Sequence, residues 1–96
     1  MRREIQEAID LLRTRDPKVH DRVLDLVQQT VFSFSMKVCG HREDAEDTSQ
    51  EVLFKATEHL PTLEDPRGLT TWLYTVAYRL ALTARAEADR RRRREF

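Results

Sequence analysis

The sequence has few of the residues that shape β-rich or disulfide-bonded proteins. Its 96 residues include two glycines, three prolines and one cysteine. A β-sandwich or barrel needs a turn signal about every 8–12 residues, so this supply of glycine and proline excludes such folds. Cys39 has no second cysteine with which to form an internal disulfide, which agrees with a reducing cytoplasm. We therefore expect an all-α, cytoplasmic protein.

Long apolar runs and an excess of either charge are also lacking. No segment approaches the ~18 consecutive apolar residues of a membrane-spanning helix, and no apolar signal-peptide stretch follows Met1. Seventeen Lys and Arg residues balance seventeen Asp and Glu residues. This balance excludes a uniformly basic coat for nucleic acid and a uniformly acidic, disordered chain. We expect no membrane partner.

The balanced charges are nevertheless unevenly distributed. From Glu43 to Glu51 the chain carries five carboxylates and no basic residue, whereas from Arg85 to Arg94 it carries six arginines. Acidic helix starts and basic helix ends complement the helix dipole, but five consecutive arginines exceed what one helix end needs. The acidic stretch suits a basic partner surface, and the arginine-rich end suits a polyanion.

Apolar residues recur at helical spacing in four segments. The pattern predicts helices over about 3–13, from Asp16-Pro17 to Gly40, from 42–44 to about 59, and from Thr70 or Thr71 into the arginine tract. Asp followed by Pro is typical of a helix start and Gly of a helix end. We predict a compact bundle of about four helices. It would form one domain over residues 1–96, with a core at about 17–90 and a basic tail at 90–96.

The third predicted helix has two different sides. One side gathers the core residues Ala45, Ser49, Val52, Leu53, Ala56 and Leu60, and the other gathers Glu43, Asp47, Gln50, Glu51 and Glu58 around Phe54. An apolar ring among carboxylates suits the anchor of a protein interface, with the charges steering a basic partner. The alternative is that Phe54 covers the second helix or is simply exposed, as single apolar residues often are.

The fourth predicted helix also has a face that its core stripe does not explain. Its core stripe contains Leu69, Trp72, Leu73, Val76, Ala77, Leu80 and Ala84, and opposite lie Thr75, Tyr78, Arg79, Leu82 and Arg85. Aromatic rings beside arginines suit single-stranded nucleic acid, because rings stack on unpaired bases and guanidinium groups bind phosphates. The alternative, which we favour for Trp72 taken alone, is ordinary packing.

No combination of residues predicts an enzyme, a metal site or a cofactor site. His20, His41 and His59 are scattered, and Cys39 and His41 are the one close Cys/His pair. A zinc site needs three or four ligands, and a Cys–His nucleophile needs an orienting third group. A metal or thiol enzyme built on these residues is the least favoured alternative.

Three features occur in an order that resembles the second conserved region (sigma2) of the sigma-70 family, and above all the extracytoplasmic-function (ECF) sigma factors. They are the string DAEDTSQEVLF at 44–54, a loop with proline and glycine, and TWLYTVA at 71–77 leading to the arginine tract. The similarity covers about residues 19–94. The acidic string and the later Trp-Leu pair are specific together, whereas each alone is weak.

The resemblance implies a transcription initiation factor that binds core RNA polymerase. The acidic helix would dock on the β′ clamp helices, in agreement with the interface inferred from helix geometry. The residues that match the family's polymerase-binding string are Asp44, Glu46, Asp47, Gln50 and Glu51, and Phe54 stands where that family usually has an apolar residue. An anti-sigma factor is a further partner implied by resemblance alone.

The resemblance also implies that the loop and the fourth helix recognise and melt the minus-ten promoter element. A base flipped from the non-template strand would enter the loop's pocket, and arginines would bind phosphates. The residues expected to contact DNA are Leu63, Arg67, Leu69, Trp72, Tyr78, Arg79, Arg85, Arg90, Arg91 and Arg92.

The chain departs from the family pattern at several positions. Many relatives carry asparagine at the position of Arg79, a polar amide or acid at Thr83, and an aromatic residue at Leu69. Because of these departures, the family pattern does not predict which bases are preferred. They also leave open an alternative function, a sigma-like module that regulates through partner binding without promoter recognition. Relatives also continue into a helix-turn-helix domain that no segment here supplies. We therefore expect part of a longer protein, with residues 90–96 beginning an interdomain linker.

Overall fold

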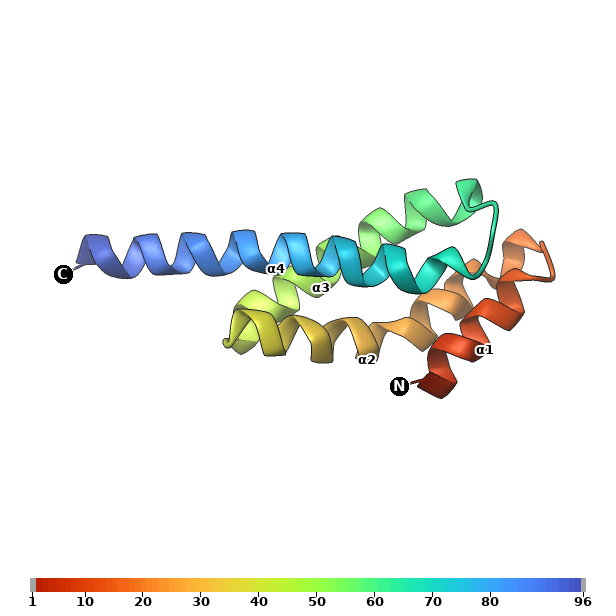
Figure 1. Ribbon diagram of the computed structural model, residues 1–96, viewed down its shortest axis with the longest axis horizontal. Coiled ribbons are helices and arrows are strands. Elements are labelled where there is room, and N and C mark those ends of the chain that lie inside the picture. Colours follow the sequence, from red (N-terminus) through yellow and green to blue (C-terminus); the bar gives the residue numbers. More distant parts are fainter. Residues whose placement is uncertain (1, 96) are drawn as a thin grey trace.

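The computed structural model describes residues 2–95, which form four α-helices and two short 3-10 helices (Figure 1). The elements are α1 (Arg2–Leu12), η1 (Pro17–Val19), α2 (His20–Cys39), α3 (Arg42–His59), η2 (Leu60–Thr62) and α4 (Gly68–Glu95). No strand occurs among residues 2–95, so the all-α prediction is confirmed. Met1 and Phe96 lie outside the described residues, as do the side chains of Arg2 and Glu95.

Helix α1 contributes to the hydrophobic core. The apolar stripe that the sequence predicts is buried, and it consists of Ile5, Ala8, Ile9 and Leu12. These side chains belong to the same apolar cluster as Val23 and Val27 of α2, on which α1 packs (Figure 1). The apolar cluster therefore includes residues well before residue 17.

Helices α2 and α3 form an antiparallel pair. Gly40 ends α2 with a left-handed backbone (φ 79°), and its N–H donates to the carbonyl of Met36 at 2.9 Å. That conformation is the one in which glycine ends helices at little steric cost. Only Gly40 and His41 separate the two helices, so the chain reverses at once. The predicted end of this helix is confirmed.

Both Asp-Pro pairs start helical structure. Asp16 accepts a hydrogen bond from the backbone N–H of Lys18 at 3.0 Å, and the 3-10 turn η1 that it caps continues directly into α2. Asp65 accepts likewise from Arg67 at 3.0 Å, immediately before α4. We predicted that the helix starts at Thr70 or Thr71. Because Asp65 caps the chain before these threonines, α4 begins at Gly68.

Helix α4, with 28 residues, is the longest helix among residues 2–95. It buries Leu69, Leu73, Ala77 and Ala81, one residue per turn, against α2 and α3. Its arginine-rich end continues as helix to Glu95 and extends beyond the other helices (Figure 1). The molecule is therefore elongated, with dimensions of 54 × 23 × 18 Å, and the predicted basic tail is helical as far as Glu95.

Candidate functional site

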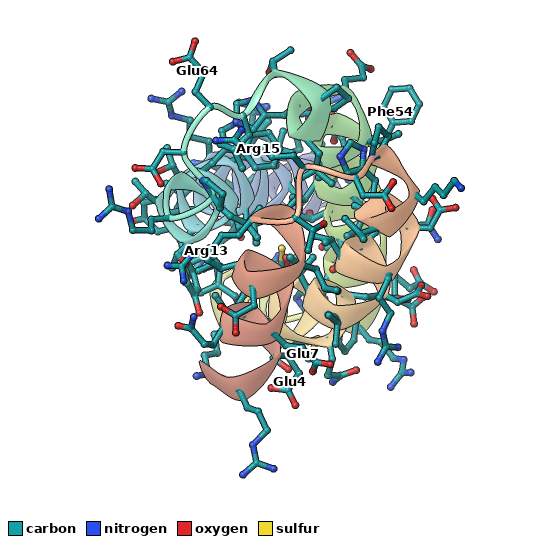
Figure 2. All side chains as sticks on the ribbon, turned by 90° about the vertical axis from the view of Figure 1, so that its right-hand side faces the viewer. Glu4, Glu7, Arg13, Arg15, Phe54 and Glu64 are labelled. Atoms are coloured by element: carbon teal, nitrogen blue, oxygen red, sulfur yellow. The ribbon has the colours of Figure 1, made fainter. Side chains whose placement is uncertain are left out.

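The carboxylate side of α3 lies at the surface. The acidic face, as we define it, consists of Asp44, Glu46, Asp47, Gln50, Glu51 and Phe54. Its members are exposed except for the half-buried Asp44. Phe54 is 67% exposed, more than any other large apolar side chain described, and its ring points away from the bundle (Figure 2). Because the ring is exposed, the alternative that Phe54 covers the second helix is wrong.

Most of the charge on the acidic face is not neutralised by the chain itself. Glu46 accepts from the guanidinium of Arg42 at 2.9 Å, one turn earlier in α3. Among the described residues, Asp44, Asp47 and Glu51 take part in no ion pair. A basic partner surface would therefore be attracted to this face.

A groove joins the acidic face to the arginine tract. Its walls are Asp44, Asp47, Thr48 and Glu51 of α3, and Leu80, Thr83, Ala84, Glu87 and Arg91 of α4. Arg91 and Arg92 also border a neighbouring hollow at the start of α3, together with His41, Arg42, Glu43, Asp44 and Ala88. The two oppositely charged stretches therefore share a border in the folded chain. The sequence did not predict this contact, because it depends on how α3 and α4 cross.

The arginines of the tract are presented to solvent along α4. Arg90, Arg91 and Arg92 are all exposed. Arg92 pairs with Asp89 one turn earlier, and Arg90 and Arg91 line a surface hollow with Glu87 and Arg94. These guanidinium groups are accessible to a phosphate backbone, which binds such groups strongly.

The loop between η2 and α4 is braced by its own side chains. The Nη2 and Nε atoms of Arg67 donate to the carboxylate of Asp65 at 2.9 and 3.2 Å. These hydrogen bonds hold the pKa of Asp65 below its ordinary value and raise the pKa of Arg67. Leu63 is half-buried and Arg67 is exposed. Both predicted loop residues therefore remain at the surface.

Leu69 requires a correction. Its side chain is 1% exposed and belongs to the core cluster with Leu73. Because α4 begins at Gly68, residue 69 falls on the buried stripe and its side chain cannot reach DNA in this conformation. Apolar periodicity predicted that Leu69 lies in the core stripe, whereas the resemblance implied a DNA contact. The burial of Leu69 agrees with the periodicity.

Trp72 packs between the core and a histidine. It is half-buried against the apolar cluster, and its indole stacks on the imidazole of His59, with ring centroids 4.5 Å apart and planes 4° from parallel. The packing interpretation is therefore confirmed for Trp72. One face of the indole is covered, so a base could stack there only if His59 moved.

The remaining predicted residues of α4 lie on two sides of the helix. Arg79 is two turns from Trp72 and shares its side, as does Thr83 in the groove. Tyr78 and Arg85 lie on the other side, toward α2. The ring of Tyr78 is 6.5 Å from that of Phe34, and Arg85 donates to the carbonyl of Val38 at 3.5 Å. All except the half-buried Trp72 are exposed.

Two aromatic residues that were not predicted from the sequence lie where α4 faces α2. Tyr74 is 36% exposed and lies one turn before Tyr78, and its ring meets Phe34 edge-on at 5.0 Å. The spacing of Tyr74, Tyr78 and Leu82 on α4 is a signal that could have identified Tyr74. Phe34 could not have been found in this way, because only tertiary packing brings α2 against α4.

The cysteine and the histidines do not converge. Cys39 is buried, with its sulfur 3.8 Å from the hydroxyl of Thr48 and from the carbonyl of Ala81. Within residues 2–95, no group of three or more His, Cys, Asp or Glu side chains is arranged to hold a metal ion. Within the same range, no helix has the length and apolar character of a membrane span.

Two comparisons with known proteins found similar sequences. The sequence matches the family Sigma-70 region 2 over residues 23–92. It is 23% identical over 78 residues to the ECF RNA polymerase sigma factor SigW of Bacillus subtilis (strain 168), covering 81% of this chain and 42% of that protein. The chain thus spans less than half the length of this relative. No solved structure matches the chain significantly. Since the family match extends over most of the sequence, this chain belongs to the Sigma-70 region 2 family.

Proposed function

We propose that the chain is the region of an ECF sigma factor that binds core RNA polymerase and captures the minus-ten promoter element in the cytoplasm. It has no enzymatic activity of its own in this proposal. The observation that carries it is the acidic face, where unpaired carboxylates surround an exposed Phe54 in a Sigma-70 region 2 chain. The similar protein from B. subtilis is named as an ECF RNA polymerase sigma factor.

The polymerase would bind through the acidic face. Asp44, Asp47 and Glu51 attract a basic surface, such as the β′ clamp helices, and Phe54 inserts between its side chains. Burial of a phenylalanine side chain contributes roughly 1.5–3 kcal/mol. The carboxylates chiefly accelerate and orient the encounter, because exposed charges add more to association rate and specificity than to affinity.

The promoter strand would bind along the loop and α4. Leu63 and Arg67 border the pocket for a flipped base, and Trp72 and Arg79 continue that surface along one side of α4. Flipping a base costs a few kcal/mol, which the pocket and the cations must offset. The remaining contacts are to phosphates and unpaired bases, and would come from Tyr78, Arg85, Arg90, Arg91 and Arg92. Leu69 supports this surface from the core.

A second candidate is a sigma-like module that binds protein partners, an anti-sigma factor among them, without recognising DNA. Two observations favour it: Arg79 stands in place of the asparagine that many relatives carry, and His59 covers one face of Trp72. Single-stranded promoter DNA distinguishes the candidates, since only the first predicts binding that weakens steeply with salt.

The decisive experiment is a titration onto core RNA polymerase. We compare the wild type with the double variant Asp47→Lys/Glu51→Lys and with the control Asp21→Lys/Asp25→Lys, which makes the same charge change at the same spacing on exposed positions of α2. We expect the first variant alone to lose binding, with circular dichroism showing all three folded. Equal binding by both variants would refute the docking face. A folded wild type that does not bind would favour the interaction module.

A further inference from the structure

One side chain ties the turn after α1 to the loop before α4. The Nη2 atom of Arg15 donates to the carbonyl of Glu64 at 2.8 Å, across 49 positions of the sequence. Arg15 lies beside the backbone that carries Glu64, whose own side chain points out to solvent (Figure 2). No other side-chain hydrogen bond joins this turn to the loop among the described residues.

The backbone at Arg15 is unusual for an arginine. Its φ of 61° is the one positive φ of a non-glycine residue among residues 2–95. Glycine is the residue that most often occupies this left-handed position just after a helix, because it carries no Cβ. Arginine is less favourable there, and what it offers in return is a side chain long enough to reach the loop.

A hollow in the surface lies at this junction. Arg15 lines it together with Pro17 and His20 after the turn and with Leu63 and Pro66 of the loop. Apolar packing therefore does not complete the junction between turn and loop. The loop has an internal brace in the Asp65–Arg67 pair, but that brace cannot set the position of the loop relative to the bundle.

We infer that Arg15 is a positioning residue, which holds the loop 63–67 at the distance from α1 and α2 needed to receive a promoter base. The inference rests on the proposed function of that loop. Arg15 precedes the family match, which begins at residue 23, so family membership assigns it no role. The donated hydrogen bond comes from a charged group, and such bonds are stronger than neutral ones.

The variant Arg15→Gly separates positioning from stability. It removes the tether while relieving the left-handed backbone, so the melting temperature should stay unchanged or rise. Arg15→Lys keeps the positive charge and a hydrogen-bond donor group on a shorter side chain, and it should retain part of the tether's effect on the loop. Arg13→Ala is the control for loss of charge alone, because Arg13 is an exposed neighbouring arginine that pairs with Asp10 and acts on Asp65 of the loop through its charge, without a hydrogen bond to the loop.

Two measurements report on the loop. In hydrogen exchange, Arg15→Gly should accelerate the amides of Leu63 and Gly68, which are hydrogen-bonded to Leu60 and Asp65, and leave the α2 amides unchanged. The probe for binding is the fluorescein-labelled single strand that the wild type enriches most from a randomised pool. We expect Arg15→Gly to weaken its binding about 5-fold and Arg13→Ala to weaken it less.

The salt dependence of binding distinguishes positioning of the loop from a direct contact of Arg15 with DNA. Loss of one phosphate contact to single-stranded DNA lowers the slope of log K against log salt by about 0.7, whereas loss of positioning leaves it unchanged. A lowered slope, unaltered loop exchange or wild-type binding by Arg15→Gly would each overturn the inference while leaving the proposed function intact. A wild type that enriches and binds no strand would overturn the proposed function, and the inference with it.

Discussion

His59, the last residue of α3, stacks its imidazole on the indole of Trp72 in α4 at a centroid distance of 4.5 Å. The two residues lie on either side of the loop that carries Leu63 and Arg67. Their contact therefore joins the two ends of the loop, while Arg15 holds its middle through Glu64. The segment proposed to receive a flipped base is thus held at both ends and at one point between.

The His59–Trp72 stack should contribute to stability. Stacked aromatic pairs are worth about 0.5–1.5 kcal/mol beyond the area they bury, so His59→Ala should lower the free energy of unfolding by about 1 kcal/mol in urea. Trp72 is the one tryptophan, so its fluorescence should change in His59→Ala, where the stack is lost. His20→Gln and His41→Gln should retain the wild-type fluorescence. An unchanged spectrum in His59→Ala would show that the two rings do not stack in solution.

Leu69 should behave as a core residue. Leu69→Ala should reduce the free energy of unfolding by about 3 kcal/mol, because truncating a buried leucine loses transfer energy and leaves a cavity. Leu82 is the matched control on the same helix, since it is 42% exposed and its replacement by alanine should change stability by less than about 0.5 kcal/mol. Chemical denaturation of both variants provides the comparison. Equal, small effects would show that Leu69 is not packed as described.

Arg79 should matter more for single-stranded DNA than Arg85. Arg79 shares a side of α4 with Trp72, whereas the guanidinium of Arg85 is already engaged by the carbonyl of Val38. Arg79→Ala should weaken binding and lower the salt slope by about 0.7, as expected for one lost phosphate contact. Arg85→Ala should weaken binding less and should change the salt slope less. The reverse order would place the DNA on the Tyr74–Tyr78 side.

The Asp65–Arg67 pair should persist at any physiological pH. Hydrogen bonds from Arg67 hold the pKa of Asp65 below its ordinary value of 3.8. Because the pKa is lower in the folded state, the contribution of the carboxylate is present above pH 3.8 and is lost only as the pH falls through the lowered pKa. An NMR titration of the Asp65 carboxyl should therefore have its midpoint below 3.8, and Arg67→Ala should move it back up. A midpoint unchanged by that variant would show that the pair does not form in solution.

Local signals in the sequence predicted much of the fold correctly. The stripe of α1 and the stop at Gly40 follow from apolar period and glycine conformation. The exposure of Phe54 was one of two alternatives that its position on a helix face left open. The start of α4 was predicted two or three residues late, although Asp65-Pro66 repeats the signal read correctly at Asp16-Pro17. That error was avoidable, because the cap is local to the sequence.

Other features depend on contacts between segments far apart in the chain. The resemblance placed Leu69 against DNA, yet the start of α4 at Gly68 places it on the buried stripe. The predicted DNA residues of α4 appeared to form one surface, but α2 and α3 pack against different sides of that helix and divide them. Helical periodicity states which residues share a face, and not which helix will cover it.

The sequence by itself determined four helical segments, an acidic helix centred on Phe54 and an arginine-rich end, because each depends on residue type and spacing along a single helix. The tertiary structure alone decided that Arg91 borders the acidic face, that His59 covers Trp72 and that Arg15 reaches Glu64. These contacts join residues remote in sequence, and their distances are set by how the helices cross and pack.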